Sequence, residues 1–433
     1  MEKFINTSKD LFSFIEKSTD AFHAVKTAGE MLEEKGFTYI SEKSVWNLES
    51  GKYYTKRNNS SLLAFEIPEG EVSGFNIVSA HTDSPNFKVK ELSDMKVENN
   101  YTKLNTEPYG GMIMASWLDR ALGISGRILL KTENGVKEIL VDTEKEYCII
   151  PNLAIHMQRD INDGHKYNPQ VDMLPLIGDE KADLGEYFAN KYGFNKEDIL
   201  SHDLFLYPME KGRIIGNNGE FIACSRLDDL QCAYSAVKAI CESEKTSKIK
   251  IAAIFDNEEV GSGTKQGADG SFLFDLIERI CECKNYSANK KHSLIAGSFM
   301  VSADNAHAVH PNFTGVMDQT NRNYLNKGIV IKFNANQKYT TDGVSSALFK
   351  SILNKNEVPF QIFHNRSDMR GGSTLGNISN SHVSLNTIDI GVPQLAMHSA
   401  YETAGIKDTY YMVMAIKGFF ESDINFAEGE YTV

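Results

Sequence analysis

Several features that mark particular classes of protein are missing from this chain. It has no basic excess: 45 Lys and Arg stand against 58 Asp and Glu, for a formal net charge of −13. Nucleic acids and anionic membranes are bound mainly by basic surfaces, so both are disfavoured as partners. No stretch has the roughly 18 apolar residues of a membrane span, and the N-terminal residues MEKFIN do not resemble a signal peptide. We therefore expect a cytoplasmic protein.

Cysteine is also scarce, with six residues in 433 and no spacing typical of a disulfide framework. Reduced thiols are expected in such a chain. The only close pair, Cys281 and Cys283, falls within a predicted helix over 272–283 and is too sparse for a zinc knuckle. A structural role for this pair is favoured over a metal-binding one.

The length of 433 residues exceeds one ordinary core and predicts two domains, or three. Before residue 90 and after 218, apolar β-branched runs alternate with helical patterns, which predicts an α/β domain with a central, mostly parallel mixed sheet flanked by helices. Between 91 and 218 the runs become short and alternating, separated by Gly, Asn and Asp. We therefore predict a discontinuous catalytic domain, 1–90 and 219–433, with a small β-rich domain inserted at 91–218.

The secondary structure that supports this division can be given by ranges. Strands are predicted at 61–68, 74–80, 248–255, 293–303, 328–339, 360–364 and 387–397. Helices are predicted from Ser8, and at 21–34, 184–192, 231–243, 272–283, 343–354 and 407–421.

Two adjacent carboxylates, Glu258 and Glu259, follow the predicted strand 248–255. Open α/β sheets place functional groups at the carboxyl ends of their strands. One of these carboxylates could bind a metal while its neighbour transfers protons. The local sequence alone favours a solvated loop, so the functional reading depends on partners elsewhere in the chain.

Such partners occur at other element ends. His81 and Asp83 follow the strand 74–80, Asp304 follows 293–303, His398 follows 387–397, and Asp228 lies at the start of a helix. Each has a plain alternative taken singly, such as a surface histidine or a helix N-cap. Taken together they are hard to dismiss, because a mostly parallel sheet brings its carboxyl ends to one edge.

Two imidazoles and several carboxylates at one edge suit a pair of zinc ions, with one carboxylate left to bridge them. Without Cys ligands, an open catalytic site is favoured over a closed structural one. Two such ions polarise a carbonyl and lower the pKa of a shared water to about 7. The remaining Glu would then act as the base.

Eight segments carry a resemblance that covers the chain nearly end to end. They are SAHTDSPNFKVK, AIHMQR, SRLDDL, DNEEVGSGTKQGA, SADNAHAVHPN, NANQKYTTD, GGSTLG and GVPQLAMHSAYETAG. In this order they resemble the signature blocks of the aspartyl aminopeptidase and vacuolar aminopeptidase I family of dinuclear zinc aminopeptidases. The resemblance implies hydrolysis of the N-terminal peptide bond, with two zinc ions per subunit that cobalt or manganese can replace.

The resemblance also implies metal ligands, residue by residue. Asp228 would bridge both ions, His81 and Asp304 would complete one site, and Glu259 and His398 the other.

Further roles follow from the same blocks. Glu258 would be the general base acting on a water that bridges the two ions, and Asp83 would orient His81. His307 would lie close to the substrate, and His156 would reach the active site of a neighbouring subunit. The inserted domain would mediate dimers, which assemble into a tetrahedral dodecamer.

The chain departs from the pattern of acid-preferring relatives at one block. A Lys is expected just before the Gln-Arg-Tyr block, where this chain has Asn336-Gln337-Lys338-Tyr339. Loss of that cation would remove a charge-assisted contact to an acidic side chain. Lys338 could replace it, and Arg370, where some relatives have Cys, could also face the pocket. The preferred N-terminal residue is therefore expected to be acidic or neutral.

Two other functions stay open at this point. A deacylase or carboxypeptidase could use a similar pair of metal ions. A catalytically silent shell protein could keep the fold for assembly alone, although such a protein would tolerate loss of ligands and all five are filled here.

Overall fold

The computed structural model describes residues 1–369, 371–372, 374–427 and 429–433. The chain forms two compact units, one of residues 1–83, 212–397 and 402–433, the other of residues 84–211 and 398–401. Both main boundaries lie seven residues before the boundaries predicted from the sequence. The short segment 398–401, which carries His398, belongs to the second unit.

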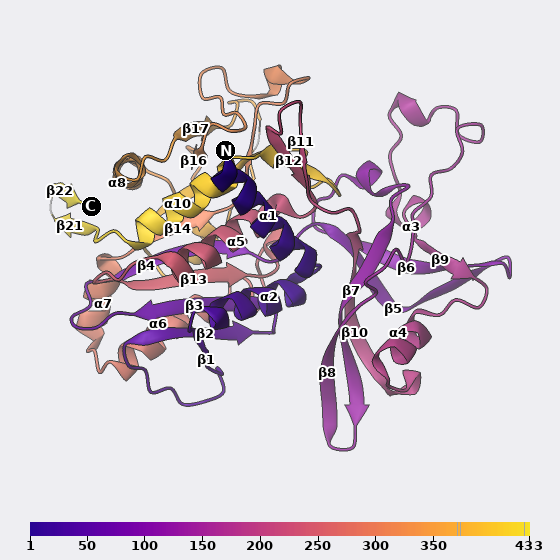
Figure 1. Cartoon of the computed structure of the whole chain (residues 1–433), viewed down its shortest axis with the longest axis horizontal. Coiled ribbons are helices and arrows are strands. Elements are labelled where there is room, and N and C mark those ends of the chain that lie inside the picture. The colour runs from indigo at the N-terminus through magenta and orange to yellow at the C-terminus, as the bar shows by residue number, and fades with distance from the viewer. Residues whose placement is uncertain (370, 373, 428) are drawn as a thin grey trace. The chain divides into compact units, whose positions relative to one another are not determined.

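The first unit is built on a nine-stranded mixed sheet (Figure 1). Its strands, in spatial order, are β1 (Thr38–Tyr39), β2 (Gly51–Arg57), β3 (Ser61–Ile67), β13 (Ile249–Phe255), β4 (Phe75–His81), β14 (Phe299–Ala303), β18 (Asn386–Gly391), β16 (Ile329–Phe333) and β17 (Phe360–His364). The four central strands β13, β4, β14 and β18 run parallel to one another. The predicted mostly parallel α/β sheet is thereby confirmed.

The central strands are apolar at successive positions because both faces of the sheet are covered. Every residue of β3, β4 and β13 is buried. Neighbouring side chains on a strand point to opposite faces, so Leu62 and Ala64 pack in one core while Leu63 and Phe65 pack in the other. A strand buried on both sides has no polar face, which explains the continuous apolar runs in the sequence.

Helices cover the two faces of this sheet (Figure 1). One core contains side chains of α1 (Glu2–Lys17), α2 (Ala21–Glu34), α5 (Leu227–Glu242), α8 (Gly343–Lys355) and α10 (Asp408–Phe420). The other core contains side chains of α6 (Phe272–Cys283), α7 (Ala288–Ala296) and α9 (Leu375–Ser379). The sheet is therefore the middle layer of three.

A second, five-stranded sheet completes the first unit. Its order is β11 (Arg213–Ile215), β12 (Phe221–Cys224), β20 (Glu402–Gly405), β19 (Pro393–Leu395) and β15 (Ala306–His307). The antiparallel pair β19 and β20 forms a hairpin whose connection contains His398. A two-stranded pair, β21 (Asn425–Ala427) and β22 (Glu430–Thr432), lies near the C-terminus.

The second unit is a six-stranded antiparallel sheet with a small core of its own. Its order is β8 (Gly135–Asp142), β7 (Leu122–Thr132), β10 (Ile199–Pro208), β5 (Asn86–Val97), β6 (Tyr101–Tyr109) and β9 (Leu176–Asp179), accompanied by α3 (Pro169–Asp172) and α4 (Leu184–Tyr192). Phe87, Trp117 and Phe188 are among the side chains buried in this core. The predicted β-rich insert is therefore an antiparallel sheet covered by a helix.

Three predicted strands were too long. One of them, 387–397, forms two strands of different sheets, β18 (Asn386–Gly391) and β19 (Pro393–Leu395). The range 293–303 begins inside α7, and only Phe299–Ala303 forms a strand, because Gly297 and Ser298 separate the helix from it. The range 328–339 leaves the sheet after Phe333, where Asn334 to Lys338 form a polar turn. Apolar content alone does not separate a short buried strand from a helix end.

The structure bears on two features of the sequence, its few cysteines and its lack of long apolar stretches. All six cysteines lie within the described residues and are free thiols. Among the described helices, none is both long and apolar enough to cross a membrane.

Candidate metal centre

The candidate site is formed where the parallel strands β13, β4 and β14 end side by side. Phe255 at the end of β13 is in register with His81 at the end of β4, and β14 pairs with the other side of β4. Asp304 is the first residue after β14, and Glu258 follows β13 by three residues. The parallel pairing therefore gathers residues that are over 200 positions apart in the sequence.

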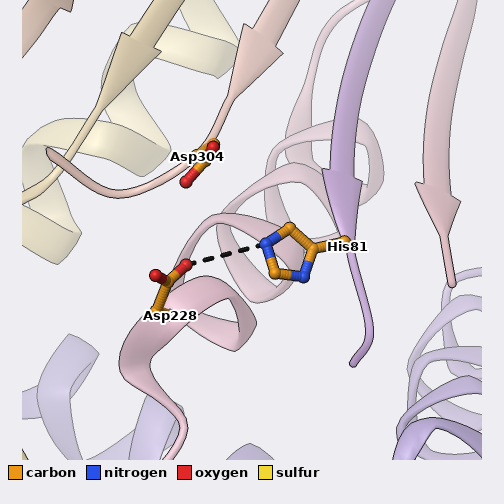
Figure 2. Close-up of side chains that lie close together, drawn as sticks. All are labelled: His81, Asp228 and Asp304. Atoms are coloured by element: carbon orange, nitrogen blue, oxygen red, sulfur yellow. Dashed lines mark ion pairs between the residues drawn. The ribbon is translucent and has the colours of Figure 1, made fainter. Parts of the chain in front are cut away.

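Three predicted ligands converge in the first unit: His81, Asp228 and Asp304. One potential ligand atom from each lies within 4.8 Å of the others. Figure 2 shows the three side chains meeting from the end of β4, the start of α5 and the end of β14. The Nε2 atom of His81 is 3.6 Å from Oδ1 of Asp228, and His81 is buried.

Asp228 occupies a distorted first turn of α5. Its backbone angles, φ −81° and ψ 112°, are not helical, and neither are those of Asp229 (φ −117°, ψ 22°). Arg226 is the N-cap of the whole span of α5, and Asp228 lies at a kink where two helical segments meet. The irregular turn presents the Asp228 carboxylate to His81.

Glu258 and Glu259 lie in a short 3₁₀ turn, η4 (Glu258–Val260), after β13. Potential ligand atoms of His81, Glu258 and Glu259 also lie within 4.8 Å of one another. The turn follows Asn257, which has the left-handed φ of +62° that Asn tolerates better than most residues. The solvated-loop alternative is therefore wrong for this pair, since both residues are at least half-buried beside a buried histidine.

Asp83 contacts both groups of ligands. Its Oδ1 accepts a hydrogen bond from the Glu258 N–H at 3.1 Å, and its Oδ2 accepts one from the Glu259 N–H at 3.1 Å. Its Oδ1 is also 3.3 Å from Nδ1 of His81, which lies 3.0 Å from the Asp83 carbonyl oxygen. One buried carboxylate thus fixes the histidine ring and the two-glutamate turn together.

The electrostatics of the cluster call for a cation. Burial raises the pKa of Asp304, and the nearby Asp228 carboxylate adds to the effect. Burial likewise raises the pKa of Glu258 to about 7. Burial lowers the pKa of His81, but hydrogen bonds to Asp228 and Asp83 outweigh it and the pKa ends well above its ordinary value. A bound cation would favour the ionised carboxylates and so oppose the effect of burial.

This donor set fits zinc. An imidazole nitrogen and several carboxylate oxygens are ligands that zinc accepts, and they meet in a buried site with nearby second-layer hydrogen bonds. Within the described residues of the first unit, His81, Asp228 and Asp304 are one group able to hold an ion, and His81 with the glutamate turn is another.

One buried residue at the site was missed by the sequence analysis. Nζ of Lys332, in β16, lies 3.7 Å from Oδ2 of Asp304. Burial alone would lower the pKa of Lys332, but the Asp304 carboxylate raises it, so the ammonium stays charged. The available signal was a lone Lys inside the apolar strand IVIKF.

The predicted substrate-binding residues do not form a cluster as the predicted metal ligands do. His307, in β15, is exposed and borders a pocket of about 280 Å³ that also includes Phe363 and Met397. Lys338 is exposed in the turn after β16. His156 is exposed in the second unit, and Arg370 lies outside the described residues.

His398 also belongs to the second unit. Its backbone is left-handed, with φ +67°, and its Nδ1 lies 2.8 Å from the Gly111 carbonyl oxygen. That contact orients the ring, and a histidine held in this way at Nδ1 binds a metal through Nε2.

Comparison with known proteins identifies the family to which this chain belongs. An α/β sheet with a histidine and carboxylates at its strand ends is the arrangement of a metal-dependent hydrolase. Residues 14–420 match the Aminopeptidase I zinc metalloprotease (M18) family. The chain belongs to this family and is a zinc aminopeptidase.

Individual relatives are similar over nearly the whole chain. The Probable M18 family aminopeptidase 2 of Clostridium novyi is 45% identical over 431 residues, covering 97% of this chain and 100% of the relative. The Probable aspartyl aminopeptidase of Ricinus communis is 35% identical over 481 residues, covering 99% and 98%. A solved structure, the S. cerevisiae mApe1 dodecamer, is 29% identical with a TM-score of 0.84, covering 96% of each chain.

Proposed function

We propose that this zinc aminopeptidase binds two zinc ions and uses Glu258 as the general base that releases the N-terminal residue of a peptide. The observation that carries the proposal is the meeting of His81, Asp228 and Asp304 beside the Glu258–Glu259 turn. Asp228 would bridge the ions, with His81 and Asp304 on one and Glu259 and the predicted ligand His398 on the other. Cobalt or manganese would be possible substitutes.

The two glutamates would have different roles, Glu259 as a metal ligand and Glu258 as the general base. When bound, the zinc ions would polarise the scissile carbonyl and supply a shared water with a pKa of about 7. Glu258 would take a proton from that water and deliver it to the leaving amine. Asp83, which holds the backbone N–H groups of both glutamates, supports this division because it fixes the turn while leaving the Glu258 carboxylate at the cluster.

Replacing the base tests the mechanism. Glu258→Gln should keep its zinc and lower kcat by about 10²–10⁴-fold, the usual contribution of a general base. The exposed Glu34→Gln is the matched control and should behave as wild type. Wild-type turnover of Glu258→Gln on a peptide panel would disprove the assignment. Mass spectrometry of the products should show peptides shortened at the N-terminus; loss of C-terminal residues would favour the carboxypeptidase alternative.

We further propose a preference for acidic or neutral N-terminal residues over basic ones. The pocket beside His307 is lined by His310, His364 and Arg366, and its described lining includes no Asp or Glu. Arg366 is itself paired with Asp368 at 2.9 Å, which weakens its pull on an acidic substrate. Lys338 remains a candidate contact. Peptides that differ only in an acidic, neutral or basic first residue should rank with the basic peptide last in kcat/KM, and a basic preference would contradict the proposal.

The assembly is proposed from the similar mApe1 dodecamer and the exposed insert. The second unit would mediate dimers that build a tetrahedral dodecamer, with His156 reaching a neighbouring active site. Light scattering should give a mass near twelve times 48.4 kDa, and His156→Ala should lower turnover without changing that mass. A monomer with full activity would exclude this role for His156. The cytoplasmic location expected from the sequence stays a prediction.

A further inference from the structure

A buried carboxylate with no role so far lies at the first residue of β20. Glu402 is 2% exposed in the first unit. Its Oε2 accepts a hydrogen bond from the backbone N–H of Asp228 at 3.0 Å, and its Oε1 accepts one from Nε2 of Gln394 at 3.4 Å. A buried charge is costly unless it is hydrogen-bonded, so both contacts bear on where Asp228 lies.

The contacts continue from Gln394 to Asn305. The Asn305 amide, Nδ2, donates to Oε1 of Gln394 at 2.7 Å and to the Leu227 carbonyl oxygen at 3.0 Å. Asn305 directly follows Asp304, and Leu227 directly precedes Asp228. The peptide group between Leu227 and Asp228 is therefore held at its oxygen and at its N–H, and the residue next to Asp304 belongs to the same buried network.

Gln231 closes this network from within α5. Its Oε1 accepts from Nδ2 of Asn305 at 3.1 Å, and its Nε2 donates to Oγ1 of Thr409 at 2.8 Å. Both Gln231 and Asn305 are buried. The two hydrogens of the Asn305 amide are shared among three acceptors, the oxygens of Leu227, Gln231 and Gln394, so this side chain is the centre of the network.

The same contacts close the base of the β19–β20 hairpin. Gln394 lies in β19 and Glu402 begins β20, so their hydrogen bond joins the two ends of the connection 396–401. His398 lies four residues from each of them along the chain. The network thus also restrains the ends of the segment that carries this predicted ligand.

We propose that Glu402, acting through Gln394 and Asn305, is a positioning residue that sets the spacing of Asp228 and Asp304 before metal binds. The inference rests on the proposed zinc site. When both are ionised and no metal ion lies between them, the Asp228 and Asp304 carboxylates repel each other. Without fixed surroundings they would move apart. Fixing the peptide groups beside them leaves less reorganisation for the metal to impose, and outer contacts of this kind typically change metal affinity by about 10–100-fold.

A purely structural role is the competing explanation, and Asp20 provides the matched control. Asp20 is also a buried carboxylate (6% exposed) whose oxygen accepts two backbone N–H groups, those of Phe22 and His23. It caps α2 and its other oxygen lies 2.6 Å from Nδ1 of His23. Its removal should cost stability, as caps do, without touching the metal site.

The test compares zinc affinity and thermal stability in the full-length protein. Zinc binding is measured by competition with a chromophoric chelator, and the Tm of the zinc-free protein is measured in parallel. Glu402→Ala should bind zinc about 10–100-fold more weakly. Glu402→Gln should lose less, because its amide oxygen can still accept the Asp228 N–H. Asp20→Ala should lower the Tm and keep wild-type zinc affinity.

The possible results distinguish the positioning role of Glu402 from the proposed zinc-dependent function. Wild-type zinc affinity in Glu402→Ala, with only a lower Tm, would overturn the positioning role and leave the proposed function intact. Failure of the wild-type protein to bind zinc would overturn both. If Glu402→Ala does not fold, Glu402→Gln and Gln394→Ala decide: weaker zinc binding in both supports the inference, and unchanged affinity in both overturns it.

Discussion

At the scale of single residues, Asp83 contacts both His81 and the Glu258–Glu259 turn, which come from distant parts of the sequence. Its two carboxylate oxygens accept the N–H groups of Glu258 and Glu259, and Oδ1 also lies beside the His81 ring. Hydrogen bonds to an ionised acceptor are stronger than those between neutral groups. Replacing Asp83 should therefore lower catalysis more than replacing an ordinary buried carboxylate.

Asp83→Asn tests this expectation. The amide has one oxygen, so one backbone N–H would face an NH₂ group and the glutamate turn would shift. We expect kcat/KM to fall about 10–100-fold together with weaker zinc binding, as for other outer contacts of metal ligands. Asp119→Asn, which changes an exposed carboxylate that likewise accepts a backbone N–H, is the control. Equal kinetics in both variants would show that the turn is held by other contacts.

Asp408 shows a residue-scale effect away from the site. It is fully buried and accepts the N–H groups of Asn326 at 2.6 Å and Gly328 at 3.1 Å. Burial outweighs these donors and raises the pKa of Asp408 to about 7. Between pH 4 and 7 the folded state therefore retains a proton that the unfolded chain has lost, and this residue's contribution to stability falls as the pH rises.

Asp408→Asn removes that titration. With each pKa unit worth about 1.4 kcal/mol, the variant should gain stability relative to wild type by up to about 4 kcal/mol between pH 4 and 8. Thermal unfolding of both proteins at a series of pH values measures the difference. A difference that stays constant with pH would mean that the two N–H donors keep this carboxyl ionised throughout.

At the scale of elements, the site depends on strands that are buried on both faces. Phe65 of β3 is fully buried and packs against Trp46 and Tyr53, at ring-centroid distances of 6.2 and 5.6 Å. Its strand pairs with β13, which leads to the glutamate turn. A strand clamped between two cores cannot shift its register without exposing a whole face.

Phe65→Ala should therefore destabilise the protein strongly. Loss of the ring leaves a cavity and costs about 3–5 kcal/mol. Val45→Ala, at a residue 99% exposed, should change stability by less than about 0.5 kcal/mol. Calorimetric unfolding of the two variants provides the comparison, and similar Tm values for both would show that the core collapses around the missing ring.

At the scale of the whole molecule, the metal should act as part of the fold. The acids around His81 are crowded and buried, so a cation bound among them would stabilise the native state. A ligand that binds only the folded state at a hundred times its Kd contributes about 2.7 kcal/mol.

Removing zinc with a chelator should abolish peptide hydrolysis and lower the Tm. Added zinc should restore both, and cobalt or manganese should restore activity in part. Magnesium is the control, since it demands octahedral oxygen ligands and should restore little. Activity that persists in fully metal-free protein would contradict the proposed mechanism.

The sequence by itself determined a great deal about this protein. Apolar runs that end in acids or histidines indicated the parallel sheet and three of its functional ends, those at His81, Glu258 and Asp304, because side-chain period and strand-end chemistry are local properties. The family blocks then predicted the aminopeptidase class, which the family match confirms. The helices α4 and α6 also begin and end at the residues predicted for them.

Other features were decided only by tertiary structure. The contact of Asp83 with the glutamate turn and the contact of Glu402 with Asp228 join residues more than 170 positions apart. The sequence did not single out Lys332, which packing places beside Asp304. Hydrogen-bond partners and burial depend on which strands become neighbours, and that is settled by the balance of burial over the whole core, which no local pattern contains.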